Sequence, residues 1–201
     1  ETSFSEVNTR ASQIANGLIE LGVKPGDRIC YLGKNMDVYY EILFGAVKAR
    51  GAMTGVNNRL APPEIAYILN DSEAPVLFVT ADFFDAVDRI RADCPKLKHI
   101  IAIEGAHEGW ADYPSWRDGG DRSDPMLANE LDDDVIQLYT SGTTGFPKGV
   151  QLSALNYAGF FSQANTLEWA IYKSGESVMN CMPLFHVAGV NFGVLGLAQG
   201  A

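Results

Sequence analysis

Arg28-Ile29-Cys30-Tyr31-Leu32 is an apolar run of strand length that lies between two helix-forming stretches. Before it, Ser3-Phe4-Ser5-Glu6 has the spacing of a capping box, and apolar residues recur at helical spacing from Val7 to Leu21. After it, a second helical pattern runs from about Val38 to Ala49. The order helix, strand, helix indicates that helices and strands alternate in this fold.

The same alternation continues as far as Ile103. Strands that alternate with helices of this length form parallel sheets with helices on both faces, so the sequence predicts an α/β fold with a parallel sheet layered with helices. The further strands expected are Met53–Val56, Val76–Val79 and His99–Ile103, and the further helices run from Pro62 to Leu69 and from a cap at Asp82 to about Arg91.

Residues 104–133 interrupt this rhythm, because Gly, Pro, Asp and Ser dominate them. We expect a solvated surface connection there. An acidic group closes the stretch, and we interpret it as part of that surface rather than as a catalytic cluster, because runs of charge usually only solvate. Its members are Glu130, Asp132, Asp133 and Asp134.

The composition narrows the class of protein. With 201 residues, 47% of them apolar, the chain can bury a substantial core as one domain or a large part of one. Fifteen scattered basic residues against 25 acidic ones give a net charge of -10, which argues against nucleic acid as a partner. Three widely spaced cysteines and the lack of a signal peptide or transmembrane pattern favour a cytoplasmic location. We expect both ends to lie within a longer protein.

A loop rich in glycine and hydroxyl side chains follows the strand pattern Val135–Tyr139, and a second apolar stretch, Val150–Leu152, follows the loop. The loop reads Thr140-Ser141-Gly142-Thr143-Thr144-Gly145-Phe146-Pro147-Lys148-Gly149. Its glycines let backbone N–H groups approach oxygen atoms, its hydroxyls donate hydrogen bonds and Lys148 adds a positive charge, so it suits a polyphosphate. A Walker A loop is excluded, because Pro147 precedes Lys148 and Gly149 follows it. Composition by itself leaves a ligand-free hairpin as the alternative.

The order of residues in Tyr139–Gly149 resembles the phosphate-loop signature of the adenylate-forming superfamily, which includes acyl- and aryl-CoA synthetases, peptide-synthetase adenylation domains and luciferases. Val23–Arg28, Lys48–Ala52, Asn57–Leu60 and Pro63–Leu69 are similar to further segments of that family. The resemblance implies that residues 1–201 are an incomplete N-terminal portion of the large AMP-binding domain in an acetyl-CoA synthetase-like fold, with the C-terminal domain absent.

The same resemblance implies a site for ATP and Mg²⁺. The loop would close over the β- and γ-phosphates, with Lys148 and Thr144 as catalytic residues and Thr140 as the contact to the metal. The implied nucleotide contacts are Thr140, Ser141, Gly142, Thr143, Thr144, Gly145 and Lys148.

A second motif, Met182-Pro183-Leu184-Phe185-His186-Val187-Ala188-Gly189, follows an expected helix over Ser153–Tyr172 and an expected strand over Ser177–Cys181. Taken alone, His186 is typical of a packed core histidine. Its setting resembles the family segment that borders the acyl pocket and the path of the pantetheine thiol, which implies a pocket-lining or gating role. Six apolar residues of this region have the spacing of ordinary core, with an apolar tunnel as the alternative: Phe160, Phe161, Trp169, Phe192, Val194 and Leu197.

Val187-Ala188 after the histidine is most similar to acyl-CoA ligases, closest to medium- and long-chain fatty acid–CoA ligases. The resemblance therefore implies an acid-thiol ligase that converts a carboxylic acid, with a fatty acid favoured, to an acyl-adenylate and then to a CoA thioester, and it allows a homodimer. An aryl acid or luciferase-like ligase and a non-catalytic acyl- or nucleotide-binding module are the alternatives. The Glu for Mg²⁺, the Asp for ribose and the adenylation Lys of the family have no counterpart here, so the chain alone is expected to be inactive.

Overall fold

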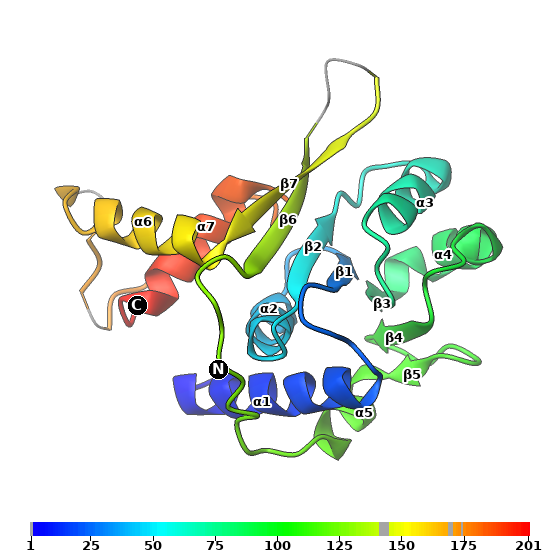
Figure 1. The fold of residues 1–201 in the computed structure, drawn as a ribbon, viewed down its shortest axis with the longest axis horizontal. Coiled ribbons are helices and arrows are strands. Elements are labelled where there is room, and N and C mark those ends of the chain that lie inside the picture. The colour runs from blue at the N-terminus through cyan, green and yellow to red at the C-terminus, as the bar shows by residue number, and fades with distance from the viewer. Residues whose placement is uncertain (1, 141–144, 169–170, 174) are drawn as a thin grey trace.

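The computed structural model describes residues 2–140, 145–168, 171–173 and 175–201. Its centre is a seven-stranded sheet with the order β5-β4-β3-β1-β2-β6-β7 (Figure 1). Neighbouring strands run parallel from β5 to β6, and β7 is antiparallel to β6. The strands are β1 Arg28–Leu32, β2 Ala52–Val56, β3 Val76–Thr80, β4 His99–Ile103, β5 Ala111–Asp112, β6 Asp134–Thr140 and β7 Lys148–Ser153. The predicted α/β class is confirmed.

Helices cover both faces of the sheet, as Figure 1 shows. One face carries α1 Phe4–Glu20, α2 Val38–Lys48 and α5 Tyr113–Gly119, and the other carries α3 Pro62–Asp71 and α4 Phe84–Ile90. Strand β3 shows why two layers form, because Val76 and Phe78 join the core under the first group while Leu77 and Val79 join the core under the second. Helices α6 Ala154–Ala164 and α7 Val187–Ala198 lie beyond the β6 side of the sheet. None of the helices in the described part of the chain is long and apolar enough to span a bilayer.

The capping box at the start of α1 forms as predicted. The Ser3 side chain accepts a hydrogen bond from the Glu6 backbone N–H, and the Glu6 carboxylate accepts from the Ser3 N–H at 2.8 Å. These two bonds satisfy backbone donors that the first turn of a helix leaves free.

Asp82 does not cap a helix, contrary to the expectation. It lies inside a 3₁₀ turn, η1 Ala81–Phe83, and its carboxylate forms an ion pair with the Lys34 ammonium at 2.6 Å, while α4 begins at Phe84. The turn forms where β3 ends, so the chain has already bent at the residue that the sequence marks as a cap. A second 3₁₀ turn, η2 Arg91–Asp93, follows α4.

The expected surface connection over residues 104–133 contains β5 and α5. Asp112 caps α5 by accepting a hydrogen bond from the Ser115 N–H at 3.1 Å, and Pro114 occupies the first turn. Tyr113 is buried against the sheet. The residues that give the segment its loop-like composition are therefore also the residues that start this short helix.

Two predictions after β7 are wrong. The helix expected over Ser153–Tyr172 ends at Ala164, with Asn165 at its C-terminal cap. The strand expected over Ser177–Cys181 is absent from the described residues, where 176–181 have no regular structure. A strand needs a neighbour to pair with, and an apolar run alone does not supply one.

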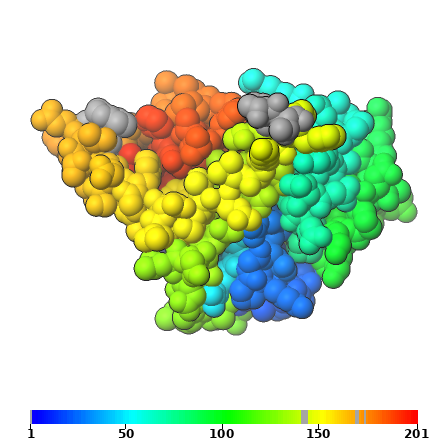
Figure 2. All heavy atoms as spheres, turned by 45° about the horizontal axis from the view of Figure 1, so that its top comes forward, coloured from blue at the N-terminus to red at the C-terminus, as the bar shows by residue number. Residues whose placement is uncertain are grey.

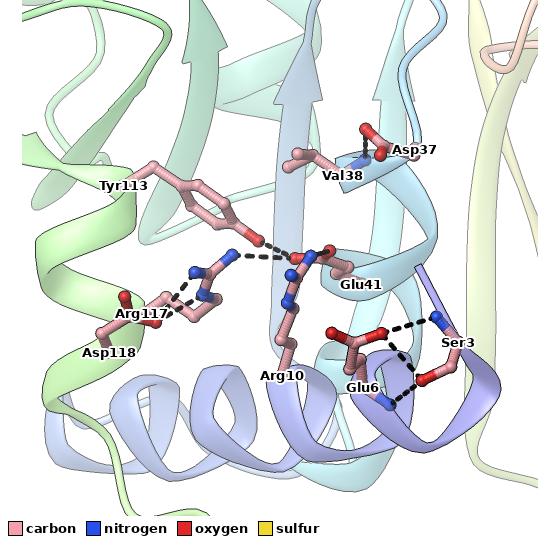
Figure 3. A network of polar contacts seen from close by, with 9 residues as sticks. All are labelled: Ser3, Glu6, Arg10, Asp37, Val38, Glu41, Tyr113, Arg117 and Asp118. Carbon is pink, nitrogen blue, oxygen red and sulfur yellow. Dashed lines mark hydrogen bonds and ion pairs between the residues drawn. The ribbon is translucent and has the colours of Figure 1, made fainter. Parts of the chain in front are cut away.

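A buried carboxylate ties three helices of one face together (Figure 3). Glu41 of α2 is 2% exposed and accepts hydrogen bonds from Arg10 of α1 at 2.6 Å, from the Tyr113 hydroxyl at 2.8 Å and from Arg117 of α5 at 3.3 Å. A charge this deeply buried is tolerated because its partners replace the water it has lost.

We expect Glu41→Gln to lower the free energy of unfolding by about 3 kcal/mol, because it leaves two arginines facing a neutral partner in a buried setting. Urea titration of the wild-type and variant proteins measures this change. Glu20→Gln, on the exposed end of α1, is the matched control and is expected to stay within about 0.5 kcal/mol of wild type. Equal effects of the two substitutions would contradict the assignment of Glu41 as a structural anchor.

Candidate functional site

The carboxyl ends of the parallel strands meet at one edge of the sheet, at the top of Figure 1. This edge is where open α/β sheets bind ligands, because the loops that leave the strands there surround a shared crevice. Lys34 and Asn35 follow β1, Asn58 and Arg59 follow β2, and Thr140 ends β6. Both motifs singled out in the sequence reach this edge.

Strands β6 and β7, on either side of the glycine- and hydroxyl-rich loop, pair as a β-hairpin. Thr140 and Lys148 are directly opposite each other in the β6–β7 register, and both are exposed. Gly145 has a φ of +94°, a backbone conformation that favours glycine. Of the predicted nucleotide contacts, the structure thus brings together Thr140 and Lys148 at the neck of the hairpin, with Gly145 in the loop. Ser141, Gly142, Thr143 and Thr144 lie outside the described residues.

Helix α3 contacts strand β6 and the two residues that precede β7. The Tyr67 hydroxyl donates to the carbonyl oxygen of Pro147 at 3.1 Å, and its ring stacks on Phe146 with centroids 5.4 Å apart. The Tyr139 hydroxyl donates to the Asp71 carboxylate at 2.7 Å. Burial, together with the hydrogen bond to this carboxylate, raises the pKa of the Tyr139 phenol, so the group stays a neutral donor.

A series of hydrogen-bonded polar side chains connects the start of β6 to Tyr139 near its end. Gln137 accepts from the Arg28 guanidinium and donates to the Tyr139 hydroxyl at 3.1 Å, and Arg28 also pairs with Asp134 at 2.7 Å. A Cβ atom on Gly149 would lie 2.2 Å from the Gln137 amide nitrogen. A larger side chain at position 149 would therefore clash with Gln137. That Gly149 also lets the backbone approach a phosphate stays a prediction.

The segment that contains the second motif is held by Asn35. The Asn35 amide donates to the Met182 carbonyl at 2.8 Å and accepts from the Leu184 N–H at 3.1 Å. Phe185 then passes over Gly55 of β2 so closely that a Cβ on Gly55 would be 2.9 Å from its Cα. These contacts place the Met182–His186 segment across the carboxyl edge. The sequence signal that could have indicated Asn35 is its place in the loop after β1, three residues beyond Leu32.

His186 is exposed and stands immediately before α7, with its ring 5.0 Å from the Phe185 ring. It is not the packed core histidine that its residue type alone suggests. Its neighbour Phe185 lines a cleft of about 270 Å³ at the carboxyl edge, which also contains two cations, Lys34 and Arg59. The other lining residues are Asn35, Asn58, Cys181 and Pro183.

A larger apolar cavity, of about 640 Å³, lies at the opposite end of β6, between that strand and helices α1, α2, α6 and α7. Three of the six residues for which an apolar tunnel was the alternative, Phe161, Val194 and Leu197, line it. Phe160 and Phe192 line a second cavity of about 230 Å³, and Trp169 lies outside the described residues. Size alone therefore does not identify the site, because the polar groups converge at the other edge.

The family model for "AMP-binding enzyme" matches residues 1–201. The chain belongs to the AMP-binding enzyme family. The fatty acid–[acyl-carrier-protein] ligase ScoC of Streptomyces coeruleorubidus is 34% identical over 194 residues, which cover 94% of this chain and 35% of that protein. The long-chain-fatty-acid–CoA ligase of Thermus thermophilus is 33% identical over 187 residues, covering 92% and 34%.

A solved structure of an AMP-binding relative gives the same arrangement of elements. The anthranilate CoA ligase AuaEII in complex with anthranoyl-AMP has a TM-score of 0.86 and 30% identity, with 98% of this chain and 38% of that chain covered. The predicted acetyl-CoA synthetase-like sheet is confirmed by this match. The chain spans about a third of the length of the curated relatives it matches.

We expect Gly149→Ala to lower the free energy of unfolding of this AMP-binding protein by about 1–3 kcal/mol, because its methyl group displaces Gln137 from two hydrogen bonds. Thermal and urea unfolding measure the change. Gly159→Ala is the matched control, since a Cβ there meets nothing within 4 Å on an exposed position of α6, and it is expected to be neutral or stabilising. Adding Gln137→Ala should remove most of the penalty of Gly149→Ala, and strict additivity of the two would contradict the packing argument.

Proposed function

We propose that the whole protein uses ATP to activate a carboxylic acid, with a fatty acid favoured, and transfers the acyl group to the thiol of CoA, and that residues 1–201 are part of its N-terminal AMP-binding domain. The observation that carries the proposal is the pairing of Thr140 with Lys148 at the carboxyl edge. Opposed residues of an antiparallel pair project from the same face, so a hydroxyl side chain and an ammonium side chain leave the ribbon together in exposed positions, which suits a polyphosphate.

The first half of the proposed reaction joins the acid to AMP. A carboxylate oxygen of the acid attacks the α-phosphorus of ATP, the bond to the β-phosphate oxygen breaks, and pyrophosphate leaves with the electron pair. Negative charge grows on the leaving group, so Lys148 and the Thr140 hydroxyl stabilise the transition state more than the ground state. The chemistry asks for positioned donors and cations rather than for a proton-transferring pair.

In the second half, a thiolate attacks the acyl carbon of the adenylate, a thioester bond forms, and AMP leaves with the electrons of the acyl–oxygen bond. The exposed His186 ring and the cleft beneath Phe185 lie where the Met182–His186 segment crosses the carboxyl edge. This placement supports a role for His186 at the border of the acyl pocket and the thiol path. Arg59 adds a positive charge to the cleft that suits an anionic substrate, while the charge of Lys34 is shared with Asp82.

Mg²⁺ fits this site through ATP rather than through a protein cage. Within the residues that the structure describes, no group of three or more His, Cys, Asp or Glu side chains could hold a metal. Mg²⁺ is commonly bound by substrate phosphates with few protein oxygens, and the exposed Thr140 hydroxyl is one such oxygen. When bound, the metal would neutralise part of the phosphate charge.

The names of the relatives suggest an alternative acid and an alternative acceptor thiol. AuaEII is an anthranilate CoA ligase, which supports an aromatic acid as the second candidate substrate, and ScoC is named for an acyl-carrier protein, which supports a carrier thiol as the second candidate acceptor. Pyrophosphate release with fatty acids of increasing chain length and with aromatic acids, followed by thioester formation with CoA or a carrier protein, separates these candidates.

The unpaired cysteines Cys30, Cys94 and Cys181 support a reducing, cytoplasmic setting.

We expect Lys148→Ala to lower kcat for acid-dependent pyrophosphate release roughly 100-fold or more, because it removes the cation that faces the growing charge. The measurement uses the whole protein with saturating MgATP and a long-chain fatty acid. Lys24→Ala is the matched control, since Lys24 is also exposed but precedes β1 at the opposite end of the sheet. Full activity of Lys148→Ala would exclude the proposed role, and a wild-type protein that binds ATP without consuming it would favour the non-catalytic module.

A further inference from the structure

Strand β6 leaves the sheet just before the proposed nucleotide contacts. Its pairing with β2 ends at Leu138, opposite Gly55. Within the described residues, Tyr139 and Thr140 pair with β7 alone, opposite Gly149 and Lys148. A two-stranded ribbon without a third strand or a packed face is marginally stable in water. The neck of the hairpin therefore needs support from outside the sheet.

Helix α3 supplies that support one residue away from each proposed contact. Tyr67 bonds the carbonyl oxygen of Pro147, which precedes Lys148, and Asp71 accepts the hydroxyl of Tyr139, which precedes Thr140. Figure 2 shows the yellow β7 side of the hairpin lying against the cyan and green surface of α3. Strand β6 and the residue that leads into β7 are thus fastened to the same helix.

The two contacts come from one face of a fixed helix. Tyr67 and Asp71 are four residues apart, so they project from the same side of α3. Ile65, Ile68 and Leu69 on the same helix are each 1% exposed and belong to the core beneath it. Because these buried residues fix α3 on the sheet, Tyr67 and Asp71 contact the hairpin from a fixed position.

The Phe146 ring makes a further contact with α3. It is 67% exposed, yet it stacks on Tyr67 at 5.4 Å with planes 30° apart. An exposed aromatic ring on a loop gains stability chiefly from such a partner. The stacking pair holds the loop close to α3 on the side that leads into Lys148.

We propose that Tyr67 and Asp71 are positioning residues that hold the neck of the hairpin over the carboxyl edge, so that Thr140 and Lys148 face MgATP in the geometry that binding requires. The proposal rests on the proposed function of this site. Neither residue needs to touch the nucleotide, since each acts through the residue beside a contact. Loss of either anchor weakens nucleotide binding and leaves recognition of the acid unchanged.

Tyr67→Phe tests the hydroxyl without removing the ring. In the whole protein, we expect KM for MgATP to rise about three- to tenfold, with KM for the acid and the melting temperature unchanged, because one hydrogen bond to the Pro147 carbonyl is lost. Tyr157→Phe is the matched control: its hydroxyl also donates one bond of 3.1 Å, to Asn191, between α6 and α7. An equal rise of KM for MgATP in both variants, or in neither, overturns the proposal.

A double-mutant cycle tests the stacking pair. Tyr67→Ala and Phe146→Ala should each raise KM for MgATP, and the double variant should be less impaired than the product of the two, because both remove the same contact. Independent, multiplicative effects overturn this part of the proposal. Asp71→Asn, which keeps an acceptor for Tyr139, should preserve more of the affinity for MgATP than Asp71→Ala.

Trypsin cleavage after Lys148 gives a readout that does not depend on activity. We expect Tyr67→Ala to be cut there at least about threefold faster than wild type and Tyr157→Phe to be cut at the wild-type rate, as followed by mass spectrometry of the fragments. Unchanged cleavage together with unchanged KM refutes the anchoring role. A wild-type protein without acid-dependent pyrophosphate release refutes the proposed function instead, and the cleavage rates then still decide whether α3 anchors the hairpin.

Discussion

The central strands of the sheet are buried on both faces, and the rest of the molecule follows from that constraint. Side chains of β3 alternate between the core under α1, α2 and α5 and the core under α3 and α4. Helices on both faces require crossover connections, and crossovers make successive strands parallel. Parallel strands end at the same edge, so the loops after β1, β2 and β6 meet although they are far apart in the sequence. Two-sided burial thus brings the residues of the candidate site to one edge of the sheet.

The β6–β7 hairpin departs from the parallel arrangement of the other strands. Strand β7 returns antiparallel at the edge, and the residues of β6 change from buried Ile136 to exposed Thr140 within five positions. Gln137 sits between these environments at 6% exposure, where an unpaired amide would be costly. Arg28 and Tyr139 satisfy it, which explains polar side chains at the centre of an apolar strand. The same bonds connect the sheet to the neck that carries Lys148.

Local sequence signals predicted most of the regular elements but not the contacts of the site. Strands β1 and β4 were predicted to the residue, and the order of the loop indicated the family that the comparison confirms. Helix α5 was missed because its cap and its proline are also loop-forming residues. The Tyr67–Pro147 and Asn35–Met182 bonds join residues 80 and 147 positions apart, and no periodicity encodes such pairs. Asn35 could have been indicated only by its place in the loop that follows a predicted strand.

The distribution of charge bears on the proposed anion site of a chain whose net charge is -10. Arginines at the amino end of the sheet are neutralised by carboxylates, Arg28 by Asp134 and Arg50 by Asp133. At the carboxyl edge, no ion pair within the described residues involves Lys148 or Arg59, and the exposed Lys34–Asp82 pair is of the weak, solvent-screened kind. Lys148 and Arg59 are therefore cations without a carboxylate partner among the described residues at that edge. A polyphosphate there would respond mainly to charges within a Debye length, about 10 Å, so these two cations act on it more strongly than distant carboxylates do.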